Sequence, residues 1–219
     1  MCEVGLDAKW IDLIMLTHFH ADHVSDLAPF LFAANYEYGQ VRELPFHLVG
    51  PAGTEQFYQG LVRAYGPSIV PVRERLRTRE LSAVAADTFI LGAVAVRSIP
   101  SMHTFPSLSY RIEADGASVT VSGDTDFSEG LIELAQETDL LVCESSFPDD
   151  LKVPGHLIPS EAGRIADSAR AKKLVLTHLY PPCDEADIVE QAHRTYAGEI
   201  IKAQDLMTLT VRGTNDPVA

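Results

Sequence analysis

Three histidines and an aspartate fall within six residues near the start of the chain, in the order His18, His20, Asp22 and His23. Successive side chains of an extended segment point to opposite sides, so His18 and His20 project to the same side. Asp22 and His23 lie where the chain turns into the next predicted helix and can face a second ion. Imidazole nitrogens and carboxylate oxygens suit zinc and are tolerable to manganese or iron. The spacing predicts metal binding.

The residues before this cluster indicate the element that positions it. Trp10 to Leu16 is a short, mostly apolar run of the kind that a buried strand makes. The cluster would then lie just past the carboxyl end of a strand, where α/β sheets build their sites.

Three further candidate ligands stand in comparable places along the chain: His103, Asp124 and His178. Each has a plainer interpretation when it is taken alone. His103 could be an ordinary loop residue, and Asp124 follows Gly123, where a turn aspartate is common. His178 could be a strand-end residue that faces water. Together with the first cluster, however, they complete a set of five imidazoles and two carboxylates.

The order and context of these side chains resemble the metallo-β-lactamase fold of binuclear metallohydrolases, over nearly the whole chain. The resemblance implies one ion on His18, His20 and His103, a second on Asp22, His23 and His178, and Asp124 between them. Two ions roughly 3.5–4 Å apart can lower the pKa of a shared water from about 15.7 toward 7, which supplies hydroxide. We therefore expect a hydrolase with two divalent ions, zinc being the first choice and manganese or iron the alternatives.

A second pair of residues narrows the expected chemistry. Glu144 ends another apolar run, and His156 follows in a loop before a helix that Ser160 could cap. The pair resembles one in the ribonuclease Z-like branch of the family, whose histidine protonates the leaving oxygen. An imidazole held by a carboxylate can act as such an acid near pH 7. The alternative is a solvated Glu144 and a loop-capping His156. Asp22, Glu144 and His156 are the expected catalytic residues, whereas His47 and His193 are interpreted as structural.

The charge of the chain constrains its substrate. A formal net charge of −14 argues against non-specific nucleic-acid binding, which depends on Lys and Arg. The tRNA-processing relatives carry a long arm between the histidine and the bridging aspartate that correspond to His103 and Asp124. Here only twenty residues separate the two, and they predict a hairpin around Asp115-Gly116. A small, anionic or cyclic phosphodiester is therefore a better substrate prediction than tRNA.

The rest of the composition favours a cytoplasmic protein. No apolar run approaches the roughly 20 residues needed to cross a bilayer, and no basic-then-apolar leader is seen. The three cysteines are an odd number without metal-ligand spacing, so a disulfide framework is not expected. Cys143 lies inside an apolar run and is interpreted as a core residue.

Helical and extended patterns alternate along the chain. Helices are predicted at 25–38, 54–65, 128–136, 160–170 and 185–196, and strands at 46–49, within 88–97, at 107–112, 118–121, 139–144 and 174–177, and near 199–202 and 206–211. The charged run 73–79 is interpreted as a solvated face. No linker or repeat is evident, so we expect one α/β (α+β) domain over residues 1–219, a four-layer αββα sandwich.

The start of the chain departs from the family pattern. Members usually place several strands and a helix before the first histidines, so about fifty residues seem to be missing, and residues 1–5 look like the end of that helix. We therefore expect an N-terminally truncated first sheet with an unpaired edge. Either the chain is a fragment, or another chain covers this edge; if 219 residues is the full length, we expect a homodimer or strand exchange.

Three functions fit these observations. The preferred one is a metal-dependent phosphodiesterase that uses a metal-bridging hydroxide and His156 as general acid. The alternatives are an esterase or lactonase of the same fold and a metal-binding scaffold with little turnover. A flavodiiron-type oxidoreductase fits less well because no flavin domain follows.

Overall fold

The computed structural model describes residues 5, 7–36, 44–71 and 74–213. Its contacts divide the chain into two compact units, residues 1–81 and 82–219, and each is described by itself. The single domain expected over residues 1–219 stays a prediction, as does the homodimer. The predicted helix end at residues 1–4 lies outside the described residues.

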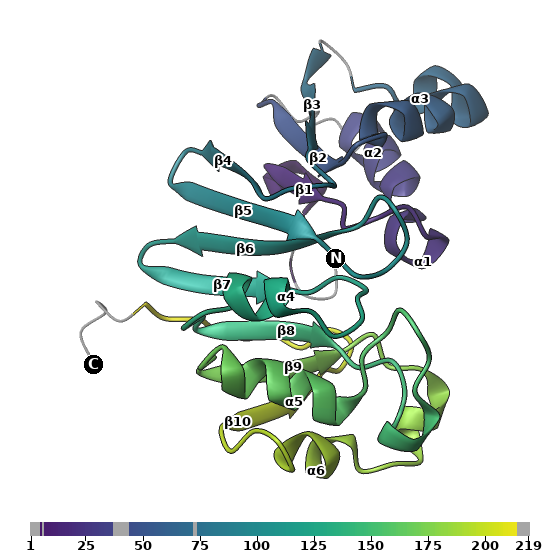
Figure 1. Ribbon diagram of the computed structural model, residues 1–219. Helices are drawn as coiled ribbons and strands as arrows, with labels where there is room; N and C mark the ends of the chain where they lie inside the picture. Colours follow the sequence, from purple (N-terminus) through teal and green to yellow (C-terminus); the bar gives the residue numbers. More distant parts are fainter. Residues whose placement is uncertain (1–4, 6, 37–43, 72–73, 214–219) are drawn as a thin grey trace. The chain divides into compact units, whose positions relative to one another are not determined.

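The first unit is built on a parallel sheet of three strands in the order β1-β2-β3. The strands are β1 (Leu13–Met15), β2 (Phe46–Pro51) and β3 (Leu76–Leu81), and the helices are α1 (Ala21–Val24), α2 (Leu27–Tyr36) and α3 (Thr54–Tyr65). Helices α2 and α3 pack on one side of this sheet (Figure 1), where Leu31, Phe46 and Leu48 are fully buried. The bounds of α3 agree with the prediction, whereas β1 is shorter than the predicted run because residues 8–10 form a 3-10 turn.

Strand β3 was not predicted, because most of its residues are exposed and polar or charged. The run 73–79, interpreted as a solvated face, exposes Arg77 and Arg79, but Arg75 is buried and the backbone from residue 76 onward pairs with β2 at the edge of the sheet. Arg73 lies outside the described residues. The Glu80 carboxylate also accepts hydrogen bonds from the backbone amides of Gly53 and Glu55 at the start of α3. Only the last residue of β3, Leu81, is buried, so neither face of the strand shows the period-two apolar alternation of a half-buried strand.

The second unit contains a mixed sheet of seven strands in the order β10-β9-β8-β7-β6-β5-β4. The strands are β4 (Asp87–Leu91), β5 (Val94–Pro100), β6 (Leu108–Ala114), β7 (Ala117–Val121), β8 (Leu140–Glu144), β9 (Lys173–Thr177) and β10 (Glu199–Lys202). The four strands from β7 to β10 are parallel, whereas β4 to β7 form an antiparallel meander. The predicted hairpin is confirmed, with Asp115 and Gly116 both at positive φ in its two-residue turn.

Three helices cover one face of this second sheet (Figure 1): α4 (Glu129–Leu134), α5 (Pro159–Ser168) and α6 (Ile188–His193). The predicted apolar face of α5 is confirmed, since Ala162, Ile165 and Ala166 are fully buried together with Ala169, the residue after the helix. They pack in one cluster with Leu141, Cys143, Leu174 and Leu176 of the sheet.

Two predictions for this unit are wrong. Ser160 does not cap α5, because Pro159 already stands at the first helical position and the helix begins after Ile158. The backbone amide of Ser160 instead donates to the Asp149 carboxylate. Residues 206–211 form no strand, although their apolar side chains suggested one; Leu206, Met207 and Leu209 are exposed. An apolar pattern alone does not show whether a segment will pair with a strand.

The topology of the second sheet decides which residues meet. Strands β7, β8 and β9 are adjacent and parallel, so the residues after Val121, Glu144 and Thr177 lie at the same end of the strands. Strand β5 runs in the same direction, because it is separated from β7 by one antiparallel strand. The loop that carries His103 therefore leaves the sheet at this end too.

Among the described residues, none of the helices has the length and apolar character needed to cross a membrane.

Candidate metal centre

The first cluster of histidines surrounds the turn from β1 into α1. His18 is buried, and its ring centroid lies 4.6 Å from that of His20 and 4.2 Å from that of His23. The Thr17 hydroxyl lies 3.1 Å from Nδ1 of His18. Asp22 is largely exposed in the first turn of α1, with Oδ2 3.5 Å from Nε2 of His23. The structure thus brings the three predicted imidazoles of this unit together.

Close packing behind β1 fixes the segment that leads into these histidines. The Leu16 amide donates to the Val49 carbonyl, which extends the pairing of β1 with β2 beyond the strand itself. Gly50 lies against this segment, and a Cβ there would stand 2.4 Å from Thr54 Oγ1 and 3.2 Å from Leu16 Cβ. Glycine is therefore required for steric reasons, and the contact holds the chain just before Thr17 and His18.

Asp124 is the centre of the second cluster. It follows β7 and is only 2% exposed, and three imidazoles surround its carboxylate. Oδ2 lies 3.7 Å from His103 Nε2 and 3.9 Å from His156 Nδ1, and Oδ1 lies 3.5 Å from His178 Nε2. One potential ligand atom from each of Asp124, His156 and His178 falls within 4.8 Å of the others. A buried carboxylate among imidazoles is a donor set that fits a divalent cation.

Two backbone features orient the histidines around Asp124. His103 Nδ1 lies 2.9 Å from the Gly155 carbonyl oxygen, an arrangement that leaves Nε2 directed at Asp124. Gly155 has a φ of +85°, and a Cβ there would come within 3.3 Å of His103 Nδ1. His178 itself adopts a φ of +57° directly after β9, a conformation that non-glycine residues seldom take. Sparsely populated backbone conformations of this kind cluster at functional sites.

Glu144 and His156 form the predicted pair. Nδ1 of His156 lies 3.1 Å from Oε1 of Glu144, and Glu144 is 1% exposed. The same carboxylate oxygen accepts a 2.7 Å hydrogen bond from the backbone amide of Thr125, the residue after Asp124. The hydrogen bond to Glu144 raises the pKa of His156 above its ordinary value of 6.5, although partial burial opposes this effect. The carboxylate therefore favours the imidazolium.

A charged network holds the loop that carries His156. Lys152 bridges the carboxylates of Asp126 and Glu161, and the amide of Gly155 donates to the other oxygen of Asp126 at 3.0 Å. Burial raises the pKa of Asp126, but hydrogen bonds from Lys152 and two backbone amides outweigh it, so this pKa lies below its usual range. The loop is thus tied both to the segment after Asp124 and to the first turn of α5.

Ser146 is the residue that sequence reasoning missed. It is fully buried two residues after Glu144, and its hydroxyl contacts three members of the cluster. Oγ lies 2.6 Å from Glu144 Oε2, 2.8 Å from His178 Nδ1 and 3.2 Å from His156 Nδ1. A serine beside a strand end is common and carries no signal of its own. Its place next to the predicted acidic residue was the one available hint.

Cys143, His193 and His47 were interpreted as structural residues rather than members of the site. Cys143 is fully buried, which raises the pKa of its thiol and agrees with its interpretation as a core residue. His193 is exposed and lies 3.2 Å from the Tyr196 carbonyl. His47 lies within β2. The union of the two clusters in one binuclear centre, and the role of each ligand in it, remain predictions.

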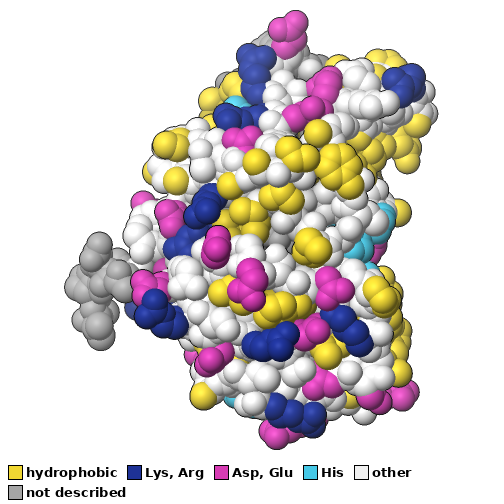
Figure 2. Space-filling model, viewed as in Figure 1, with side chains coloured by type: hydrophobic (Ala, Val, Ile, Leu, Met, Phe, Trp, Pro, Cys, Tyr) yellow, Lys and Arg dark blue, Asp and Glu magenta, His cyan; other side chains and the backbone are white. Residues whose placement is uncertain are grey.

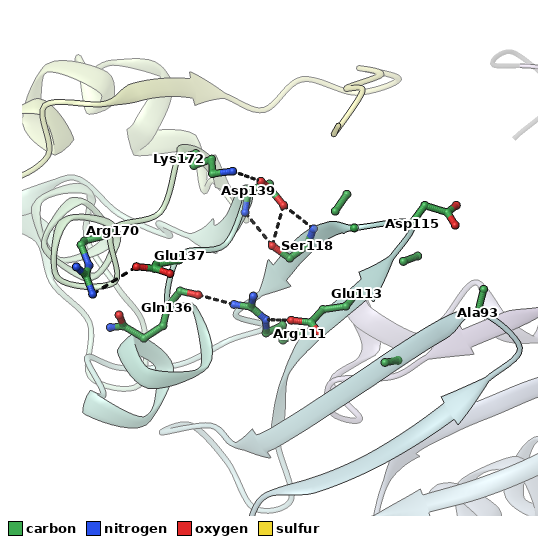
Figure 3. Close-up of a pocket in the computed structure, with 14 residues that line it drawn as sticks. Ala93, Arg111, Glu113, Asp115, Ser118, Gln136, Glu137, Asp139, Arg170 and Lys172 are labelled. Atoms are coloured by element: carbon green, nitrogen blue, oxygen red, sulfur yellow. Dashed lines mark hydrogen bonds and ion pairs between the residues drawn. The ribbon is translucent and has the colours of Figure 1, made fainter. Parts of the chain in front are cut away.

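A separate cavity of about 830 Å³ surrounds the turn between β6 and β7, at the end of β7 remote from Asp124. Figure 3 shows that its cations point at neighbouring oxygens: Lys172 at Asp139, Arg170 at Glu137, and Arg111 at Glu113 and the Gln136 carbonyl. Hydrogen bonds from Arg111 to the Gln136 carbonyl and from Ser118 to the Asp139 carboxylate join the hairpin to the segment at the start of β8, so the cavity has a structural explanation. Its lining residues include no histidine or cysteine among those described.

Comparisons with known proteins identify the family and the fold. Residues 2–179 match the family described as "Beta-lactamase superfamily domain". A ribonuclease Z of Mycobacterium bovis is 28% identical over 232 residues, which span 95% of this chain and 82% of that protein. The crystal structure of the metallo-β-lactamase fold protein YhfI from Bacillus subtilis aligns with a TM-score of 0.76 and 24% identity, over 93% of this chain and 78% of that one.

A more distant structure, unliganded yeast PDE1, aligns with a TM-score of 0.65 and 18% identity, over 90% of this chain and 67% of that chain. At these identities the solved structures establish the fold, an α/β architecture of mixed sheets flanked by helices. The family match covers most of the sequence, and the buried carboxylate among imidazoles supplies the His/Asp cluster that such a fold uses for metal. The chain belongs to the metallo-β-lactamase superfamily.

Proposed function

We propose that this protein is a metal-dependent phosphodiesterase that cleaves a small or cyclic phosphodiester. The observation that carries the proposal is the Glu144–His156 pair, which lies beside the buried carboxylate of Asp124. Divalent ions bound by the two histidine clusters would supply an activated water and stabilise developing charge on the phosphoryl oxygens. The chain's own acid would then act on the departing alkoxide.

His156 is placed to serve as that acid. Its Nδ1 faces Glu144 and Ser146, so the proton for the leaving oxygen is held on Nε2. Glu144 stabilises the imidazolium, and the raised pKa keeps a larger protonated fraction near neutral pH. After it gives up the Nε2 proton, the neutral ring remains oriented by Glu144.

The surface charge and the short segment between His103 and Asp124 both favour a small substrate. The net charge is −14, and on the face that carries α4 and α5 basic side chains alternate with acidic ones (Figure 2). Residues 104–123 are taken up by a loop and the β6–β7 hairpin, and no long arm leaves this segment. The ribonuclease Z relative supports phosphodiester chemistry, while these features favour a substrate smaller than tRNA.

The test compares leaving groups. Turnover of bis(p-nitrophenyl) phosphate and of a cyclic nucleotide is measured with zinc or manganese, for the wild-type protein, His156→Ala and Glu144→Gln. His156→Ala should slow the cyclic nucleotide, whose leaving group is an alkoxide, by about 10²–10⁴-fold. The p-nitrophenyl ester should suffer less, because its leaving group needs little protonation. A lactone, a thioester and an RNA oligonucleotide serve as competing substrates.

Metal content separates the two roles that the geometry allows for His156. If His156 is the acid, His156→Ala keeps the wild-type number of bound ions; loss of one ion would make it a ligand instead and remove the acid assignment. Equal slowing of both phosphodiesters would also contradict it. Faster cleavage of the lactone, the thioester or the RNA than of either small phosphodiester would overturn the substrate proposal.

A further inference from the structure

The hydroxyl of Ser146 lies between the Glu144–His156 pair and His178 of the second histidine cluster. Ser146 is 0% exposed, and Oγ lies within hydrogen-bond distance of Glu144, His156 and His178. The shortest of the three contacts, at 2.6 Å, is the hydrogen bond that Ser146 donates to Oε2 of Glu144. Its complete burial and its committed proton exclude a nucleophilic role, since a nucleophile must reach the substrate.

The positions of the protons follow from what each group can donate. An ionised carboxylate only accepts, so the single hydroxyl proton of Ser146 goes to Glu144. The lone pairs of Oγ then face Nδ1 of His178 at 2.8 Å and Nδ1 of His156 at 3.2 Å. Both contacts are favourable only if each Nδ1 carries a hydrogen. The hydroxyl therefore selects the same tautomer in two histidines.

This tautomer has a consequence at the opposite side of the His178 ring. With Nδ1 protonated, neutral His178 carries its lone pair at Nε2, the atom 3.5 Å from Oδ1 of Asp124. A lone pair there repels a carboxylate unless a cation lies between them, whereas an N–H would simply donate to it. Metal-binding histidines commonly have the other ring nitrogen held by such a partner.

We propose that Ser146 is a positioning residue that fixes His178, and with it His156, in the Nδ1–H tautomer and thereby sets the metal affinity of the second cluster. The inference rests on the proposed function only for the acid role of His156. Without the hydroxyl, Nδ1 of His178 loses the acceptor that Ser146 provides, and the ring should change to the Nε2–H tautomer, which donates to Asp124 and competes with the metal.

The variants for the test differ in one group each. Ser146→Ala removes the hydroxyl, and Ser146→Thr restores it. Ser145→Ala is the matched control, because Ser145 is equally buried in the neighbouring position and its Oγ has no hydrogen bond within the described part of the chain. Thermal denaturation of the metal-free proteins establishes that each variant is folded.

Two readouts need no substrate. Zinc affinity is measured by competition with a chelating dye, and the imidazole tautomers of the metal-free proteins are read from long-range ¹H–¹⁵N NMR spectra. Ser146→Ala should weaken zinc binding by about 10–100-fold and convert His178 to the Nε2–H form. Ser146→Thr and Ser145→Ala should both stay near the wild-type affinity and keep the wild-type spectrum.

Several outcomes would overturn the inference: wild-type zinc affinity in Ser146→Ala, an unchanged His178 tautomer, or equal weakening in a folded Ser146→Thr. If the added methyl group prevents Ser146→Thr from folding, the spectrum of Ser146→Ala decides. Absence of phosphodiester turnover in the wild-type protein would contradict the proposed function and leave this inference standing, because neither readout involves a substrate.

Discussion

The two histidine clusters of this chain are built in different ways. The first takes its imidazoles from one segment, His18 to His23, and its rings lie mainly against one another, with His20 exposed. The second collects His103, Asp124 and His178 from separate strand ends, and hydrogen bonds orient them. Local sequence suffices to assemble the first cluster, whereas the second exists only because β7, β8 and β9 are neighbours in one sheet.

This difference predicts unequal sensitivity to loss of a carboxylate. Asp124→Asn should reduce turnover by about 10²–10⁴-fold or more, a loss as large as that for removal of a general acid or base. The side chain is only 2% exposed, and the three imidazoles around it would lose their charge partner. Asp22→Asn should cost less, about 10–100-fold, because water can replace a side chain that is 57% exposed. Turnover and metal content of both variants check this. Equal losses would show that the two clusters do not differ in this way.

Substitution of Gly50 tests how tightly the segment before the first cluster is packed against β2. Gly50→Ala should lower the free energy of unfolding by about 1–3 kcal/mol, because its Cβ meets Thr54 and Leu16. Gly60→Ala is the control: its Cβ has only Arg63 nearby, so in the middle of α3 it should raise stability by about 0.5–1 kcal/mol. Urea denaturation measures both. A neutral Gly50→Ala would mean that the segment before His18 can shift freely.

The framework beneath the second cluster should respond to pH. Asp139 precedes β8 and receives hydrogen bonds from Lys172 and from the amide and hydroxyl of Ser118. Burial raises the pKa of Asp139, but these hydrogen bonds outweigh it, so its pKa lies below the ordinary value of 3.8. Its stabilisation is therefore complete above that value and is lost as the pH falls through the lowered pKa.

Asp139→Asn should accordingly reduce the free energy of unfolding by about 1–2 kcal/mol at neutral pH. The difference from the wild-type protein should shrink as the pH falls below 3.8 and through the lowered pKa, because the carboxyl of the wild-type protein then becomes protonated in the folded as well as the unfolded state. Denaturation of both proteins across this range provides the measurement. A difference that does not vary with pH would assign the effect to packing and leave the ionised carboxylate without a role.

The smallest effect is expected for a histidine that lies outside both clusters. His193→Gln should leave metal content unchanged and turnover within about twofold, as for most surface substitutions. His193 lies at the end of α6, exposed, beside a backbone carbonyl. A loss of metal in this variant would show that imidazoles beyond the two clusters contribute to binding.

Most elements were predictable where their pattern was local. The hairpin turn Asp115-Gly116, the helix Thr54–Tyr65 and the buried face around Ile165 follow from turn chemistry and periodicity. The errors arose where tertiary structure outweighs pattern. Strand β3 pairs with β2 although most of its residues are exposed and polar or charged, and residues 206–211 are apolar but form no strand.

The sequence by itself determined the chemical types: imidazoles and carboxylates at strand ends, and an acidic residue before a histidine in the chain order of a metallo-β-lactamase superfamily member. Tertiary structure decided the contacts among them. It placed the Ser146 hydroxyl between Glu144 and His178, and it surrounded Asp124 with three imidazoles. The physical reason is that side-chain type and local spacing are encoded along the chain, whereas the pairing of distant strands sets which side chains become neighbours.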